Sequence, residues 1–209
     1  PSQYFVLNAL INGGVQPAEV NFKYTTDAFQ AAAAFAADKS IAAAVSWAPD
    51  IYNLAKVKGN KLIVTTADAN KMIADVWFSR ADFAKDNPGI VEALVRGFLQ
   101  AADDLDLQEN KIKVSKWMAD GYNLPADEAL GMLGDAHWTN YAENREFFLN
   151  QNNATNFERT WETAYYLYKR IGKVSEKVAW DKVADFSIIQ KLGADAQFSK
   201  SQNKYLVNF

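Results

Sequence analysis

The chain has 209 residues, of which 49% are apolar, and its formal net charge is −3. This length suffices for a sizeable core, and the small charge excludes the strongly basic surface that binding to nucleic acid or to an anionic membrane requires. The absence of cysteine and the single histidine, His137, exclude disulfides and thiolate metal sites and argue against a Ser-His-Asp triad. We therefore expect no metal ion and no cofactor. Since no apolar run approaches ~20 residues, we also expect no membrane span.

The first part of the chain predicts alternating helices and strands. Ser2 is a suitable N-cap for a helix that Gly13-Gly14 ends, and Asp27 is suited to cap an Ala-rich helix over residues 28–37. Pro49 is placed to begin another helix. The apolar patterns of strands occur at residues 20–24, 41–47, 61–66 and 73–79. Such alternation is typical of a mostly parallel sheet with helices on its faces.

After about Arg80 the pattern changes to helices. Asn87-Pro88 opens a long helix with apolar residues at helical spacing as far as Leu105. Further helices are expected near residues 111–119, 126–133, 143–150, 156–171 and 177–192, and a strand pattern returns at 205–209. We therefore expect an α/β domain over residues 1–78 and a mainly helical region over residues 79–209. The wide apolar faces of these helices predict exposed apolar surface, where a further part of the protein packs.

Four segments in the first part of the chain carry recognisable helix and strand patterns in a fixed order. They are residues 2–13, 19–22, 31–35 and 41–50, and the last contains the motif Trp47-Ala-Pro49. This set resembles the solute-binding proteins of ABC importers for taurine, alkanesulfonates, nitrate and thiamine-pyrimidine precursors. In that family a capped helix, a strand and an Ala-rich helix precede a small-residue strand that ends in Trp-x-Pro. The chain departs from the family at Ile41-Ala42, where an acidic residue is common, and it lacks the first lobe.

The resemblance implies a type II periplasmic-binding fold. Residues 1–78 would form its second α/β lobe, a mostly parallel sheet with flanking helices, and the helical C-terminal region would pack on the missing N-terminal lobe. The implied function is to bind a small polar solute, anionic if helix N-termini contact it, in a cleft between the lobes and to deliver it to an ABC permease. The implied location is the bacterial periplasm or an attachment to the cell envelope.

The first candidate contacts for the solute lie at a helix N-terminus and after a strand. The hydroxyl of Ser2 and the N–H groups of Gln3 and Tyr4 suit an anionic oxygen. Trp47 and Asp50 follow a predicted strand, at the sheet edge where α/β proteins bind ligands, so Trp47 would stack on the solute and Asp50 would accept a hydrogen bond. The structural alternatives are an ordinary N-cap, a core tryptophan and a carboxylate that favours the helix dipole.

Two further candidates come from the later strand segments. Thr66 follows the strand predicted at residues 61–66, again at a carboxyl end. Trp77 lies on the expected crossover between the lobes, where it would line the cleft or the hinge. The alternative for Thr66 is a loop cap, and the alternative for Trp77 is a buried strand position.

Two polar clusters in the helical region favour structural interpretations. The segment His137-Trp138-Thr139-Asn140 has no companion ligands at metal spacing, so we interpret it as local packing and hydrogen bonding. The carboxylates of Asp103, Asp104 and Asp106 lack the loop of an EF-hand and fit a solvated helix face better than a calcium site. No phosphate-binding or nucleophile-elbow motif occurs in the sequence. We therefore expect no enzymatic activity.

Two other functions remain open from the sequence. One is a scaffold or sensor module of the cell envelope, fused to another domain, because residues 204–209 resemble the start of an OmpA-like peptidoglycan-binding domain. The other is a pyrimidine-precursor synthase, since some proteins of this fold consume a histidine of their own in that reaction. A single histidine and the lack of cysteine argue against the synthase.

Overall fold

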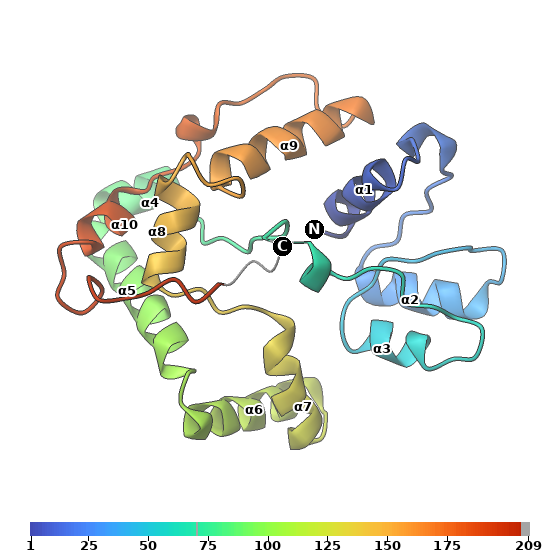
Figure 1. Ribbon diagram of the computed structural model, residues 1–209, viewed down its shortest axis with the longest axis horizontal. Coiled ribbons are helices and arrows are strands. Elements are labelled where there is room, and N and C mark those ends of the chain that lie inside the picture. The colour runs from blue at the N-terminus through green and yellow to red at the C-terminus, as the bar shows by residue number, and fades with distance from the viewer. Residues whose placement is uncertain (70, 206–209) are drawn as a thin grey trace. The chain divides into compact units, whose positions relative to one another are not determined.

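The computed structural model describes residues 1–69 and 71–205, and it shows helices joined by irregular segments (Figure 1). Among the described residues there is no strand and no sheet. The prediction of an α/β fold, with a parallel sheet of the periplasmic-binding type, is therefore wrong. The helical character predicted for the C-terminal region extends to the whole described chain.

The segments predicted as strands run as irregular chain, apart from Thr66 at the end of one of them. Residues 42–46, 61–64 and 74–79 donate no backbone hydrogen bond to another described backbone group. A strand forms only where a neighbouring strand supplies a ladder and cross-strand side-chain contacts, and the run Ala42–Ala44 offers little side chain for such contacts. Of the strand predicted at residues 205–209, only Tyr205 lies within the described residues, and it is in no regular element.

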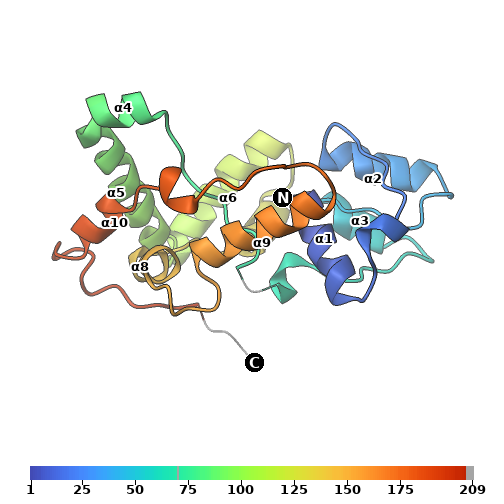
Figure 2. The same cartoon turned by 90° about the horizontal axis from the view of Figure 1, so that it is seen from above.

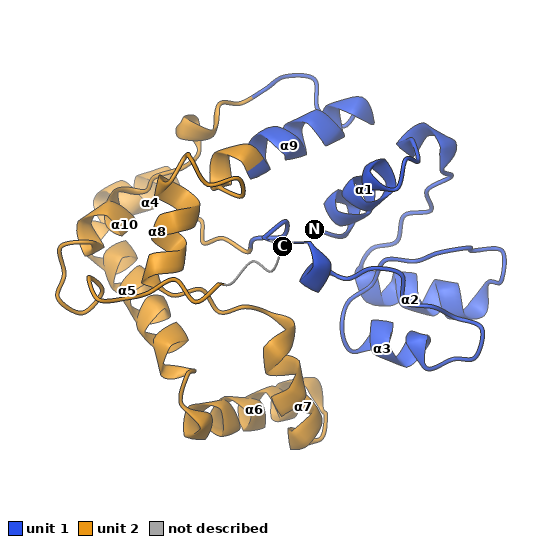
Figure 3. Cartoon of the chain, in the orientation of Figure 1, with its two compact units in different colours: residues 1–74, 160–177 blue, residues 75–159, 178–209 orange. Residues whose placement is uncertain are grey.

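The chain divides into two compact units (Figure 3). Unit 1 comprises residues 1–74 and 160–177, and unit 2 comprises residues 75–159 and 178–209. One crossing between the units, at 74/75, lies close to the boundary expected at 78/79. The return of residues 160–177 to unit 1 was not expected from the sequence.

Unit 1 is built on short helices. Its elements are α1 (Ser2–Asn12), the 3₁₀ turn η1 (Pro17–Glu19), α2 (Ala28–Ala37), α3 (Asp50–Ala55), the 3₁₀ turn η2 (Thr66–Asp68) and most of α9 (Phe157–Arg170). Of these helices, α1, α2 and α9 bury a few residues and α3 buries none. Tyr4 and Leu7 of α1 pack against Leu167 of α9, with apolar side chains such as Phe22 and Ile73 around them. Helices α2 and α3 lie side by side (Figures 1 and 2).

Unit 2 contains the longer helices. They are α4 (Ala81–Asp86), α5 (Pro88–Asp104), α6 (Gln108–Tyr122), α7 (Ala126–Met132), the 3₁₀ turn η3 (Leu133–Asp135), α8 (Tyr141–Leu149), the 3₁₀ turn η4 (Trp180–Lys182) and α10 (Ser187–Leu192). Helix α6 packs against α7, and α8 packs against α10, as both views show (Figures 1 and 2). Residues from the start of α6, the end of α7 and the start of α8 line one cavity.

The core of unit 2 joins α5, α8 and α10. Leu99, Tyr141, Leu192 and Phe198 are almost completely buried and form one apolar cluster. The Tyr141 hydroxyl donates a hydrogen bond to the Ile189 carbonyl at 3.0 Å. Around this core, Arg96 of α5 binds Asp195 at 2.6 Å and Glu92 at 2.9 Å, which ties α5 to the segment after α10.

Most helix predictions are confirmed, with two corrections. The long helix after Asn87 is α5, and the Asp27 carboxylate caps α2 by accepting from the Gln30 N–H at 2.8 Å. Ser2, by contrast, is the first helical residue rather than the N-cap, which is Pro1. Of the helix expected over residues 177–192, only Ser187–Leu192 is α-helical. The Asp185 carboxylate accepts a hydrogen bond from the Ser187 N–H, and this turn precedes the start of α10.

Large apolar side chains lie exposed on both units. Ile63 is 79% exposed and Phe78 is 94% exposed. Both residues lie in irregular segments, outside the helices whose apolar faces led to the expectation of exposed apolar surface. That expectation, and the missing lobe proposed to cover the surface, stay predictions. Within the described residues, no helix combines the length and hydropathy needed to cross a bilayer.

Candidate functional site

A cavity of about 510 Å³ lies in unit 2, and its floor is the junction of α5 and α6. Asp103 lies in the last turn of α5, Leu105 and Asp106 follow it, and Lys111 lies near the start of α6. A helix C-terminus carries partial negative charge, so acidic residues in this last turn lower the stability of α5. Local conflicts of this kind concentrate at functional sites.

The opposite wall comes from α7, η3 and the segment that follows them. It contributes Leu130, Leu133 and the indole of Trp138. The Trp138 ring N–H donates to the Leu133 carbonyl at 3.2 Å, which fixes the orientation of the indole, and the side chain remains 44% exposed. This wall therefore offers an apolar, largely preformed surface of the kind that small-molecule sites use.

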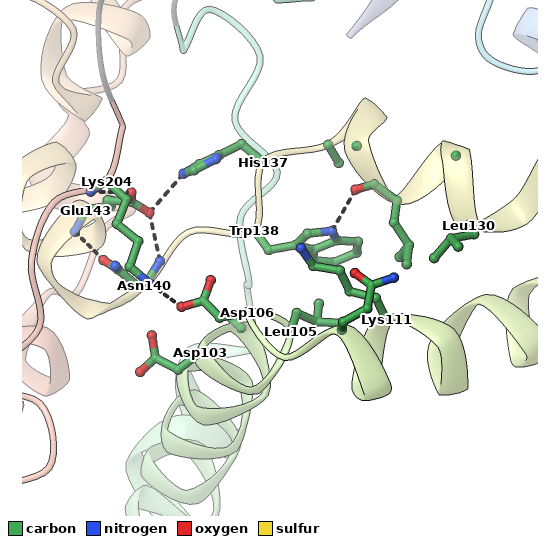
Figure 4. A pocket seen from close by; sticks show the side chains of 16 residues that line it. Asp103, Leu105, Asp106, Lys111, Leu130, His137, Trp138, Asn140, Glu143 and Lys204 are labelled. Carbon is green, nitrogen blue, oxygen red and sulfur yellow. Dashed lines mark hydrogen bonds and ion pairs between the residues drawn. The ribbon is translucent and has the colours of Figure 1, made fainter.

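A capping box at the start of α8 forms the third side of the cavity. The Asn140 side chain accepts from the Glu143 N–H at 3.0 Å, and the Glu143 carboxylate accepts from the Asn140 N–H at 2.9 Å. The same carboxylate accepts from the Lys204 N–H at 2.9 Å and lies 2.9 Å from Nε2 of His137 (Figure 4). Glu143 is only 3% exposed, so these contacts replace its hydration.

The C-terminal segment is held over this side by further contacts. The Asn140 amide donates to the Gln202 carbonyl at 2.8 Å, and the Ser201 hydroxyl accepts from the Ala142 N–H at 3.1 Å. The Lys204 ammonium pairs with the Asp106 carboxylate, and this partner raises the pKa of Lys204 above its usual range. The segment thus closes one end of the cavity through residues far apart in the sequence.

Two charged groups of the cavity, Asp103 and Lys111, have no hydrogen-bonding or ionic partner among the described residues. Asp106 is paired with Lys204, and each oxygen of the buried Glu143 carboxylate accepts a backbone N–H. No hydrogen bond or ion pair to the Asp103 carboxylate or the Lys111 ammonium exists among residues 1–69 and 71–205. Burial raises the pKa of Asp103, and the nearby carboxylates of Asp106, Asp104 and Glu143 add to this rise against the opposing effect of Lys204.

None of the seven residues predicted from the sequence lines this cavity. Two of them do meet in unit 1, where the Trp47 ring N–H donates to the Ser2 hydroxyl at 3.0 Å. Gln3 donates to the Tyr24 hydroxyl at 3.0 Å, and Tyr4 lies in the core of unit 1.

The other three predicted residues are Asp50, Thr66 and Trp77. Asp50 is the first residue of α3, and Thr66 is the first residue of η2. The adjoining Thr65 and Asp68 form the capping box of η2, which fits the loop-cap alternative. Trp77 belongs to unit 2, where its ring lies against that of Phe98 with centroids 5.7 Å apart.

Sequence reasoning identified the parts of the unit 2 cavity but did not assemble them. The Asp103 cluster and the segment 137–140 were interpreted separately as solvated and structural. The spacing of Asn140 and Glu143 matches a capping box, and this local signal could have located the start of α8 but was not used. The contribution of Lys204 has no local signal, because it lies 61 residues from Glu143.

Comparison with known proteins finds no match among family models, curated proteins or solved structures. Within the described residues, no group of His, Cys, Asp and Glu side chains has the arrangement of a metal site. The chemistry of the cavity therefore has to be inferred from its own side chains.

Proposed function

We propose that the protein binds a small polar solute, without changing it chemically, in the cavity of unit 2. The observation that carries the proposal is a cavity of about 510 Å³ with an apolar tryptophan wall and two unpaired charged groups, Asp103 and Lys111. Small-molecule sites have volumes of roughly 300–1,000 Å³ and combine apolar walls with a few polar groups. The site differs from the interlobe cleft expected from the sequence, because it requires no sheet and no second lobe.

The resemblance of residues 1–50 to importer-associated solute-binding proteins supports the same class of function. On this basis we propose that the full-length protein delivers its solute to an ABC permease and acts in the periplasm or at the cell envelope. The cavity supplies the binding step of that role, and the permease supplies the transport step.

The pair of His137 and Glu143 has the side-chain types of an acid–base pair, but its contacts favour a structural role. Both oxygens of the Glu143 carboxylate accept backbone N–H groups, from Asn140 and Lys204. The His137 ring also packs edge-on against Tyr205, with centroids 4.8 Å apart. A catalytic base must have a free lone pair within reach of the substrate proton. We therefore propose that this pair fastens the C-terminal segment and closes the cavity.

The test is a thermal-shift screen of the purified chain with sulfonates, nitrate, phosphate, amines, amino acids and pyrimidines. A bound solute raises the melting temperature in proportion to RT ln(1 + [L]/Kd). We expect at least one compound to stabilise the wild type with saturable dependence on concentration. The effect should be lost in Trp138→Ala and kept in Trp117→Ala, whose indole is 60% exposed on α6 outside the cavity. No shift with any compound on the folded protein would refute the proposal.

The alternative function, a cell-envelope scaffold or sensor module, is favoured by one observation. Trp77 and Phe78 are consecutive and are 63% and 94% exposed, and such exposure is common at protein–protein contacts. The sequence of the full-length gene distinguishes the two functions. A wall-binding domain after this chain favours the scaffold, and a lipoprotein signal with no further domain favours transport.

A further inference from the structure

We infer that the solute carries a positive and a negative group at once, as a free amino acid does. In this arrangement Asp103 receives the ammonium group and Lys111 the carboxylate. The inference rests on the proposed function and deepens it, because it names the class of solute that the same cavity takes. Three features of the cavity lead to it: the charges that remain unpaired, the helix ends that carry them, and the apolar wall between them.

The unpaired charges are found by elimination. Of the carboxylates that line the cavity, Asp106 is neutralised by Lys204, and Glu143 is only 3% exposed and already accepts a backbone N–H on each oxygen. Of the ammonium groups, that of Lys204 forms an ion pair with Asp106, and within the described part of the chain Lys111 has no acidic partner. Asp103 and Lys111 are both half-buried. A solute with one charge would leave either Asp103 or Lys111 without a counter-charge, whereas a zwitterion satisfies both.

The helix ends give the two sides of the cavity opposite electrostatic sign. Asp103 lies at the C-terminal end of α5, where the helix carbonyl groups add negative potential and attract a cation. Lys111 lies near the start of α6, whose first turn has no side-chain cap hydrogen bond, so its N–H groups add positive potential. Figure 4 shows the side chains of Asp103, Asp106, Lys111 and Trp138 around the same cavity.

The apolar side chains that line the same cavity suit the apolar part of such a solute. Trp138 is fixed by its hydrogen bond to the Leu133 carbonyl, and Leu105 and Leu130 line the same cavity. These side chains offer a hydrophobic surface and no further charge. We therefore expect amino acids with apolar or aromatic side chains to bind more tightly than glycine.

The experiment compares L-leucine and L-phenylalanine with their methyl esters, which lack the carboxylate, and with their N-acetyl forms, which lack the ammonium. Affinities are measured by isothermal titration calorimetry on the wild-type chain. We expect the free amino acids to bind, and each blocked form to bind about ten-fold to a hundred-fold more weakly, because each loses one charge-assisted contact. Blocked forms that bind as tightly as the free amino acids would overturn the inference.

Variants assign each charge to its side chain. Asp103→Asn should weaken binding of the free amino acid about ten-fold or more but leave the N-acetyl form unchanged. Lys111→Gln should weaken the free amino acid similarly but leave the methyl ester unchanged. The controls are Asp104→Asn and Lys113→Gln, which change neighbouring charges that do not line the cavity. If a variant does not fold, the comparison of free and blocked amino acids on the wild type still decides the question.

The outcomes separate this inference from the proposed function. Binding of a sulfonate, an amine or a pyrimidine without binding of any amino acid would overturn the zwitterion and leave solute binding intact. The absence of binding by every compound of the thermal-shift screen would overturn both.

Discussion

Glu143 is the residue whose replacement most directly tests how the cavity is built. Its carboxylate accepts backbone N–H groups from Asn140 and Lys204, at 2.9 Å each. In Glu143→Ala both donors lose their partner, and a buried donor left unsatisfied costs about 1–3 kcal/mol. The Asn140 amide remains buried, whereas water can reach the Lys204 amide once its segment detaches. We therefore expect the free energy of unfolding to fall by about 2–4 kcal/mol.

Glu143→Gln refines the same prediction. Glutamine keeps one acceptor oxygen, so it can serve either Asn140 or Lys204, and its amide group faces the other N–H as a second donor. We expect the free energy of unfolding to fall by about 1–2 kcal/mol, so that the stability of this variant lies between the stabilities of the wild type and of Glu143→Ala. Urea unfolding, followed by far-ultraviolet circular dichroism and tryptophan fluorescence, measures both values. Amide hydrogen exchange of residues 201–205 should accelerate in both variants, with little change in α5.

The matched control is Glu128→Ala. Glu128 occupies the same third position of its helix, α7, but it is exposed and its helix has no capping box. We expect a change of about 0.5 kcal/mol, from the loss of a favourable charge near the helix N-terminus. A stability of Glu143→Ala within about 0.5 kcal/mol of this control would refute the structural role given to the buried carboxylate.

Three further predictions concern charge and packing in unit 2. Asp103→Asn removes a carboxylate whose pKa is raised, so it should stabilise the protein by about 0.3–1 kcal/mol at pH 7. In urea titrations this gain should shrink as pH falls through the folded-state pKa of Asp103 and vanish below its ordinary value of 3.8. Arg96 lowers the pKa of Asp195 below its ordinary value of 3.8, so the pair's contribution to the free energy of unfolding is present above pH 3.8 and is lost as pH falls through the folded-state pKa. In Arg96→Met, the free energy of unfolding should therefore depend less on pH in this acid range, as measured by urea unfolding. Gly193→Ala places a methyl group 2.9 Å from the Tyr141 hydroxyl, so it should lower the free energy of unfolding by about 1–3 kcal/mol, as measured by thermal denaturation. Gly97→Ala, which has open space around the added methyl group, should stabilise α5 by about 0.5–1 kcal/mol.

Local patterns in the sequence predicted the helices, because the residues that begin and end a helix lie close together in the sequence. Asn87-Pro88 predicted the start of α5, and Asp27 predicted the start of α2 through a cap that the structure contains. Strands carry no such local information. The run at residues 41–47 has a strand-like pattern, but a strand exists only where another segment pairs with it, and among the described residues no partner does.

The candidate site was harder to predict because its parts are distant in sequence. Asp103, His137 and Lys204 come from three separate segments, and each has an unremarkable structural interpretation when considered alone. The clue in the sequence was the pair of acidic residues, Asp103 and Asp104, in the last turn of α5, where the helix dipole disfavours them. Only the fold shows that Lys204 neutralises Asp106 and leaves Asp103 free.

The central claim, that the solute binds in the cavity of unit 2, is tested most directly by the indole signals of the six tryptophans. Protein labelled with ¹⁵N in its indole groups is titrated with each solute of the thermal-shift screen, and the signals of Trp138 and Trp47 are assigned by replacing each with phenylalanine. The account predicts that the Trp138 signal shifts saturably with a bound solute while the Trp47 signal stays in place. A saturable shift of Trp47 without Trp138 would place the solute at the sequence-predicted site in unit 1 and contradict the account.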